Sequence, residues 1–232
     1  GIGAAILWNR KCIDVPVSHI AGDDAKKMSE DGFSALLLFV MIAIVLQGML
    51  RDGVTTWMPS LVADIYHMSN SVSILTGVAL PLFGIICFRA AERLYQFSPD
   101  NPVKCAGIVF GLGTISAVIL YVTSGRNAAL TVFCAALLTG CMHGVNLLLI
   151  CMVPPYYKKR GGVATISGLL NSCTYIGSSV STYGIAAVAD RFGWQTTVFA
   201  WIIIAAVGCI ICFACVRPWK KFVYNEKMEY NE

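Results

Sequence analysis

Six long stretches of this 232-residue chain contain no Asp, Glu, Lys or Arg. They cover residues 33–50, 72–88, 105–123, 128–154, 161–189 and 195–216. A helix needs roughly 20 apolar residues to cross a bilayer core about 30 Å thick, so each stretch can span, some with flanking residues. The stretches are apolar or small all round, whereas a soluble helix keeps a polar face and barrel strands alternate strictly. We therefore expect six transmembrane helices in an all-α membrane protein.

The composition agrees with this class. Hydrophobic residues make up 57% of the chain and charged residues 13%, against roughly a quarter charged in soluble domains. The mean hydropathy is +0.70. The net charge of +4 gives no reason to expect a nucleic-acid partner, because the basic residues collect between the apolar stretches. The placement of these basic residues instead indicates how the chain is oriented in the bilayer.

Basic residues are concentrated in alternate connections. Of the 17 Lys and Arg, three fall on one side of the expected membrane: Arg51, Arg126 and Arg191. The other fourteen lie before the first stretch or after the second, fourth and sixth stretches. Because basic residues are retained on the cytoplasmic side, we expect both termini in the cytoplasm and a multi-pass protein of the plasma membrane.

The chain divides into three regions. Residues 1–8 (GIGAAILW) are apolar but too short to span, and residues 9–32 are hydrophilic. We expect residues 1–32 to be the end of a preceding helix and a cytoplasmic interdomain linker, residues 33–216 to be the bundle and residues 217–232 to be a cytoplasmic tail. On this interpretation the chain starts within a longer protein, whose amino-terminal part supplies another bundle.

Small residues recur at helical spacing within the stretches. Spacing of this kind lets helix backbones approach closely, so we expect packing roles for Gly107, Gly111, Gly140, Gly144, Gly168, Gly177 and Gly184. Pro81 lies inside the second stretch, where it should free a backbone carbonyl and bend the helix.

Three of the ten cysteines, Cys209, Cys212 and Cys215, repeat every three residues. They are either metal ligands or a thiol stripe that faces a neighbouring helix. Neither a His, a carboxylate nor a fourth Cys is nearby, which favours the stripe. We expect no metal and no cofactor.

Arg51 ends the first stretch and is the first candidate for function. If the helix continues to Trp57 or beyond, the guanidinium lies within the outer half of the bilayer. A guanidinium that faces inward would bind phosphate or carboxylate oxygens two at a time; one that faces outward would snorkel to the headgroups. Asp52 should point elsewhere on the helix and be a poor partner for Arg51.

Other polar residues lie inside the fourth and fifth stretches. His143 and Asn146 share one helix face, and Asn171, Tyr175, Ser178 and Thr182 form a stripe along another. Such residues either line a water-filled cavity or form hydrogen bonds between helices; we favour the bonds for Ser178 and Thr182. His143 is also a candidate proton relay, since imidazole titrates near neutrality. The chain lacks the motifs of serine hydrolases, zinc proteases and phosphate-binding loops, so we expect no enzyme activity.

The motif PPYYKKRGG, followed by a glycine-rich stretch and GIAAVADRFGWQTTVF, resembles the carboxyl-terminal half of the major facilitator superfamily. The resemblance covers about residues 9–216 and implies one six-helix half-bundle of that fold. It implies a structural motif at the extracellular end of the superfamily's eleventh helix, carried here by Gly184, Asp190, Arg191, Gly193 and Trp194. It implies a cytoplasmic gating motif with Gly84, Arg89 and Arg93; the usual Asp is absent, and Glu92 is a possible replacement.

A narrower resemblance concerns MLRDGVTTWMPSLV, which is similar to the seventh helix of the organophosphate:inorganic phosphate antiporters. It implies that Arg51 binds substrate phosphate, with Trp57 close by in the same motif. Tyr175 matches a tyrosine of the family's eleventh helix. His143 departs from the family, which has Tyr at that place. The candidate substrate-binding residues are therefore Arg51, Trp57, His143, Asn146, Asn171 and Tyr175.

These resemblances imply half of a secondary active transporter. It would exchange a sugar phosphate or glycerol phosphate for inorganic phosphate by alternating access, together with an amino-terminal six-helix half. Two alternatives stay open: a major facilitator carrier for another anionic or small organic solute, and a sugar-phosphate receptor of the same fold that does not transport.

Overall fold

The computed structural model describes residues 35–69, 74, 76–160 and 162–228 of the chain. The predicted linker and preceding helix at residues 1–32 lie outside these described residues, as do the first residues of the second apolar stretch. Everything that follows concerns the described ranges.

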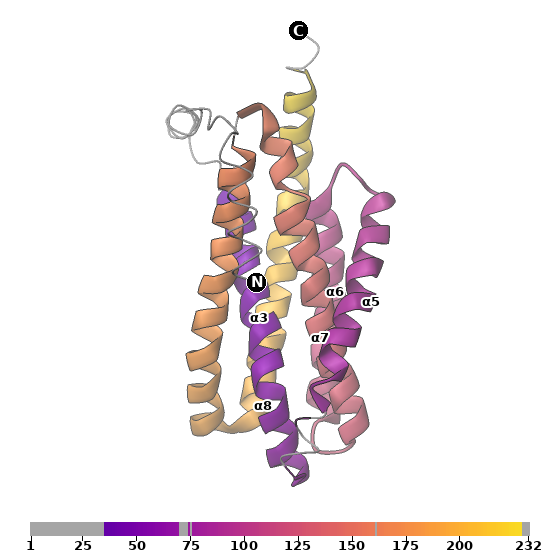
Figure 1. Cartoon of the computed structure of the whole chain (residues 1–232), viewed down its shortest axis with the longest axis vertical. Helices are drawn as coiled ribbons and strands as arrows, with labels where there is room; N and C mark the ends of the chain where they lie inside the picture. The colour runs from indigo at the N-terminus through magenta and orange to yellow at the C-terminus, as the bar shows by residue number, and fades with distance from the viewer. Residues whose placement is uncertain (1–34, 70–73, 75, 161, 229–232) are drawn as a thin grey trace, which may run out of the picture.

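The described part of the chain is all-helical and contains no strand. Its helices run along the long axis of an elongated bundle (Figure 1). In chain order they are α3 (Ala35–Tyr66), α5 (Ala79–Gln96), α6 (Pro102–Thr123), α7 (Ala128–Asn146), a π-helical turn η1 (Leu147–Cys151), a 3-10 helix η2 (Pro154–Arg160) and α8 (Val163–Met228).

α8 is interrupted at Gly193, where the backbone has a φ of 79° that favours glycine. Figure 1 shows the chain reversing there, so that α8 consists of two arms lying along the bundle. We call residues 163–192, which pack on α3, the inner arm, and residues 194–228, which pack on α6, the outer arm.

Four helices are long and apolar enough to cross a membrane by length and composition: Ala35–Tyr66, Pro102–Thr123, Ala128–Lys158 and Val163–Tyr224. Apolar side chains also cover the outside of the bundle; Leu112 is 54% exposed, Ile115 58% and Ile210 66%. A soluble protein rarely exposes so much apolar surface. The predicted all-α membrane class is therefore supported.

The backbones of α3 and the inner arm of α8 approach closely. A Cβ atom added to Gly48 would collide with the carbonyl of Thr174, and one added to Gly177 would collide with the carbonyl of Val45. Ser181 joins the same contact, because its Oγ donates to the Met49 carbonyl at 2.7 Å. The predicted packing role of Gly177 is confirmed.

α7 packs on α5 through the predicted glycines. A Cβ added to Gly140 would lie 2.8 Å from the Phe83 carbonyl oxygen, and one added to Gly144 would lie 3.0 Å from the Cβ of Ala91. Two other predictions are wrong: no atom of the described residues lies within 4 Å of a Cβ added to Gly168 or Gly184. Helical spacing gives the face of a glycine, but neither of these two meets a neighbouring described helix.

α6 packs on the outer arm of α8 through Gly107. A Cβ there would lie 3.3 Å from the Cβ of Cys212, and Cys209 Sγ donates to the Gly107 carbonyl at 3.4 Å. Cys212 and Cys215 are buried. The three cysteines are thus a thiol stripe that turns toward the α6 side, and the described residues hold no group of three His, Cys, Asp or Glu suited to a metal ion.

Pro81 lies in the first turn of α5 rather than inside a longer helix. Proline lacks an N–H, so the Gly77 carbonyl four residues earlier has no helical donor at that position. The Leu80 N–H bonds this carbonyl instead, at 3.2 Å. The predicted bend therefore becomes a turn at Gly77 and Val78, after which α5 begins.

The contact between α3 and the inner arm gives a first prediction. Gly177→Ala should destabilise the protein by about 1–3 kcal/mol, the usual cost of overpacking, since its Cβ meets backbone atoms that cannot rotate away. Gly184→Ala is the matched control and should be neutral or slightly stabilising, because the site is open and alanine favours helix. Thermal unfolding in detergent measures both, and equal midpoints would contradict the packing.

Candidate functional site

Arg51 lies in the middle of α3, a helix of 32 residues. At 1.5 Å per residue it is about 23 Å from either end of the helix. Its side chain is only 18% exposed. Snorkelling serves basic residues near helix ends, so this position favours a guanidinium that faces the protein interior.

Asp52 is the direct partner of Arg51, so the prediction that it would point elsewhere is wrong. Arg51 Nε donates to Asp52 Oδ1 at 2.6 Å, and Arg51 Nη2 donates to Asp52 Oδ2 at 2.8 Å. The helix separates neighbouring Cβ atoms by about 100°. However, the long arginine side chain folds back across that angle and forms a bidentate pair.

Two further helices complete this cluster. Arg51 Nη1 lies 3.5 Å from Asn146 Oδ1 on α7, and Ser178 Oγ of the inner arm of α8 donates to Asp52 Oδ2. Ser178 also bonds the carbonyl of Thr174 at 3.1 Å. We call Arg51, Asp52, Asn146 and Ser178 the polar cluster. It joins the middle of α3, the last residue of α7 and the middle of the inner arm of α8.

Two further polar side chains of α3 lie one turn on either side of Arg51. Gln47 is buried one turn before Arg51, and its Nε2 donates to the Met142 carbonyl of α7 at 3.1 Å. Thr55, one turn after Arg51, donates its hydroxyl to the Arg51 carbonyl at 2.6 Å. α3 therefore carries polar side chains at three successive turns within an otherwise apolar helix.

A pocket of about 690 Å³ opens next to Thr55, one turn after Arg51 on α3; none of the four residues of the polar cluster lines it. Thr55 borders it from α3, and Thr139 and His143 border it from α7. The rest of its wall comes from α5 and the turn before it: Gly77, Leu80, Pro81, Gly84, Ile85, Phe88, Arg89 and Glu92. A largely apolar pocket with a few polar groups is the usual form of a small-molecule site.

Gly84 makes room for His143 in this pocket. A Cβ added to Gly84 would lie 3.2 Å from His143 Cδ2, so the imidazole packs directly over the glycine. Arg89 and Glu92 form an exposed ion pair of 3.0 Å within α5, and Arg93 is exposed. Glu92 thus pairs along its own helix.

The residues of the predicted polar stripe on the inner arm do not share one environment in the structure. Ser178 makes the favoured bond between helices, but Thr182 bonds the Ser178 carbonyl of its own helix at 2.9 Å. Tyr175 is 63% exposed and Asn171 is exposed. On α3, Trp57 Nε1 is buried without a hydrogen-bond partner in the described part of the chain.

The motif around Gly193 forms the corner between the two arms of α8. Trp194 Nε1 donates to Asp64 Oδ2 at 2.8 Å and so ties this corner to the end of α3. Asp190 and Arg191 are exposed, and Gly184 is open on its outer side. Asp190, Arg191 and Trp194 therefore lie at one end of the bundle, away from the polar cluster, whereas Gly184 lies about 14 Å before the corner, nearer to Ser178.

Sequence reasoning missed Asp52, Gln47, Thr55 and Thr139 as members of the site region. Gln47, Arg51 and Thr55 are spaced by four residues, which is a signal for one polar helix face. Thr139 lies one turn before His143, which is the same signal of a polar face on α7.

The sequence was compared with known proteins. No protein-family model matches it, and no curated protein matches it.

The pairing of Arg51 with Asp52 gives a second prediction. In a double-mutant cycle, Arg51→Gln and Asp52→Asn should show a coupling of about 1–3 kcal/mol, the range for contacting groups in one network. Unfolding in detergent micelles measures it. The exposed Arg89–Glu92 pair is the matched control and should couple by less than about 0.5 kcal/mol. Equal coupling in the two cycles would show that Arg51 and Asp52 are not an interior pair.

Proposed function

We propose that the chain forms one wall of a secondary active transporter of the major facilitator type and that the polar cluster binds an anionic organic solute. The observation that carries the proposal is the Arg51–Asp52 pair, which lies in the middle of apolar helices and one turn from Thr55, at the border of an open pocket. Ionisable groups at such depth are costly and are usually kept for substrate, ion or proton pathways.

The proposed architecture is a half-bundle of six membrane crossings. α3, α6 and α7 supply three, and the two arms of α8 supply two, since the chain reverses at Gly193. α5 supplies the sixth, because its earlier residues are apolar. Arg89, Glu92 and Arg93 near its end raise its polarity. A second six-helix half would cover the open pocket as the other wall.

Asp52 gives this site an internal counter-ion. Its carboxylate occupies the Nε and Nη2 donors of Arg51, a pair of donors that a phosphate or carboxylate of a solute would use. An arriving anion therefore replaces Asp52 at the guanidinium, and Asp52 keeps its bond from Ser178. Exchange of one anion for another then never leaves Arg51 unpaired in the bundle.

The preferred solute class is a small organic phosphate exchanged against inorganic phosphate, as the resemblance of the Arg51 segment implies. A carrier for a carboxylate would use the same donors and is the first alternative. The receptor alternative would bind the same anion in the same pocket without moving it.

Flux in proteoliposomes tests the proposal on the full-length protein. Arg51→Gln should reduce phosphate counterflow at least about 100-fold, since hydrogen bonds to a charged partner are worth roughly 1.5–3 kcal/mol each and two are lost. Arg126→Gln, which removes an exposed cation between α6 and α7, is the matched control and should keep wild-type flux. Unchanged counterflow in Arg51→Gln would rule out its role, flux of carboxylates alone would favour the first alternative, and binding without flux would favour the receptor.

The counter-ion role of Asp52 gives a separate prediction. Asp52→Asn removes the competing carboxylate but keeps the side-chain shape, so phosphate should bind about tenfold more tightly while exchange becomes slower. Binding of labelled phosphate to the detergent-solubilised protein, alongside counterflow, measures the two effects. Ser178→Ala is the companion variant, because it loosens Asp52 without removing its charge. Weaker phosphate binding in Asp52→Asn would contradict the exchange of partners.

A further inference from the structure

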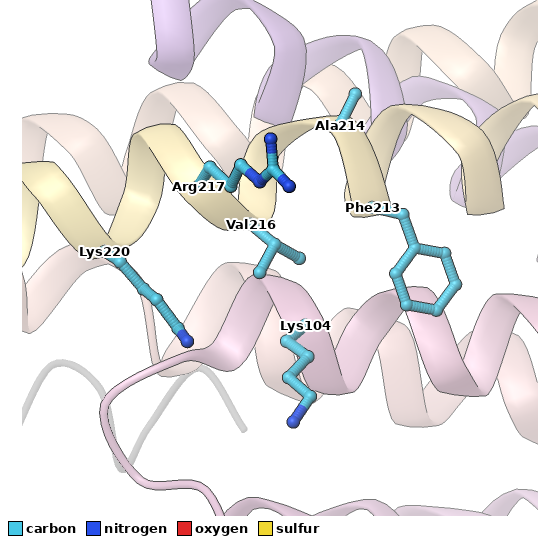
Figure 2. Close-up of a pocket in the computed structure, with 6 residues that line it drawn as sticks. All are labelled: Lys104, Phe213, Ala214, Val216, Arg217 and Lys220. Atoms are coloured by element: carbon cyan, nitrogen blue, oxygen red, sulfur yellow. The ribbon is translucent and has the colours of Figure 1, made fainter.

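A second pocket, of about 480 Å³, lies between α6 and the outer arm of α8. It is lined by Lys104, Phe213, Ala214, Val216, Arg217 and Lys220 (Figure 2). Three of these six residues are cations, and no carboxylate is among them. We call this pocket the cationic groove. None of its residues belongs to the polar cluster or to the pocket that Thr55 borders.

The three cations of the groove are exposed, and none forms an ion pair with a described residue. They come from two helices, and Figure 2 shows Phe213 and Lys220 reaching from α8 toward α6. Figure 2 also shows that the Lys104 ammonium points away from α8 and that the Arg217 guanidinium lies against α8, on the side away from Lys104. No carboxylate lines the groove, so an anion from outside the chain can pair with these cations.

The groove lies where two apolar helices end. Lys104 is in the first turn of α6, and Arg217 and Lys220 follow directly after the charge-free stretch of the outer arm. In a bilayer this is the level of the lipid headgroups, where long basic side chains meet phosphate. By the distribution of basic residues, the leaflet is the cytoplasmic one.

Below the cations, both helices present exposed apolar stripes. On the outer arm the stripe follows Arg217 at spacings of three and four residues, through Phe213, Ile210, Val207 and Ile203. On α6 it consists of Leu112, Ile115, Ile119 and Val122. Residues at these spacings share one helix face. On each of the two helices, the cationic end therefore continues into an apolar surface that suits acyl chains.

The packing between the two helices holds the groove in shape. The Phe213 ring lies 3.4 Å from a Cβ position on Gly107, so it packs directly over this glycine of α6. The buried Trp219 donates its Nε1 to the Asp100 carbonyl just before α6, at 3.1 Å. The two helices that carry the cations are thus held together by packing and by this hydrogen bond.

We propose that the cationic groove binds an anionic phospholipid of the cytoplasmic leaflet. The flexible side chains of Lys104, Arg217 and Lys220 turn toward the headgroup phosphate when the lipid binds, and the acyl chains lie along the two apolar stripes. A soluble phosphate would satisfy the cations but would leave Phe213 and the stripes uncovered, which is why the apolar continuation favours a lipid. The site is independent of the transport proposal.

Native mass spectrometry of the full-length protein titrated with phosphatidylglycerol tests the site. The variant Lys104→Gln/Arg217→Gln/Lys220→Gln should bind this lipid at least about tenfold more weakly, since each basic residue near an anionic headgroup contributes roughly fivefold. The matched control, Arg93→Gln/Lys158→Gln/Lys221→Gln, removes three exposed cations outside the groove and should keep wild-type binding. Lys104→Arg/Lys220→Arg keeps the charges and should bind normally, which separates charge from folding.

Three results would overturn the proposal. An equal loss in the control variant would show that the attraction depends on overall charge and not on the groove. Equal binding of phosphatidylcholine would show that the headgroup charge is not recognised. Displacement of the lipid by inorganic phosphate at the same concentration would show that the groove is a site for a soluble anion.

Discussion

The close contact between the backbones of α3 and the inner arm of α8 determines where the polar groups of this protein meet. Gly48 and Gly177 remove the side chains that would hold the two helices apart. Ser178 directly follows Gly177, and Asp52 follows Gly48 by about one turn, so the contact brings this hydroxyl and carboxylate together. Between membrane helices there is little hydrophobic force, and such small-residue packing is what holds them.

The class of the protein and several packing contacts could be predicted from the sequence. Charge-free stretches report membrane helices because the cost of a charge in lipid is high whatever the tertiary structure. Gly140 and Gly177 were found because a recurring glycine on one face usually meets another helix. Arg51 stood out because a charge beside a long apolar stretch is rare.

Other features depend on three-dimensional geometry that the spacing of residues along the sequence does not determine. The Arg51–Asp52 pair depends on the conformation of a flexible side chain, and a helical wheel treats these neighbours as diverging. Gly168 lies nine residues before Gly177 and so faces the opposite side of the helix, whereas Gly184 lies seven residues after Gly177 on nearly the same face. A Cβ on Gly184 still meets no described atom, because the part of a face that is covered depends on how the neighbouring helices cross it. For the same reason Ser178 turns toward α3 whereas Tyr175, three residues earlier, is exposed.

The reversal at Gly193 has a mechanical consequence. One residue with a positive φ joins the two arms of α8, and the indole of Trp194 fastens that corner to α3. The two arms are thus joined without an intervening loop. A tilt of the inner arm, which carries Ser178, therefore acts at this corner on the outer arm, whose Trp201 and Trp219 are buried in the bundle. Movement at the polar cluster is in this way coupled to the helix that packs on α6.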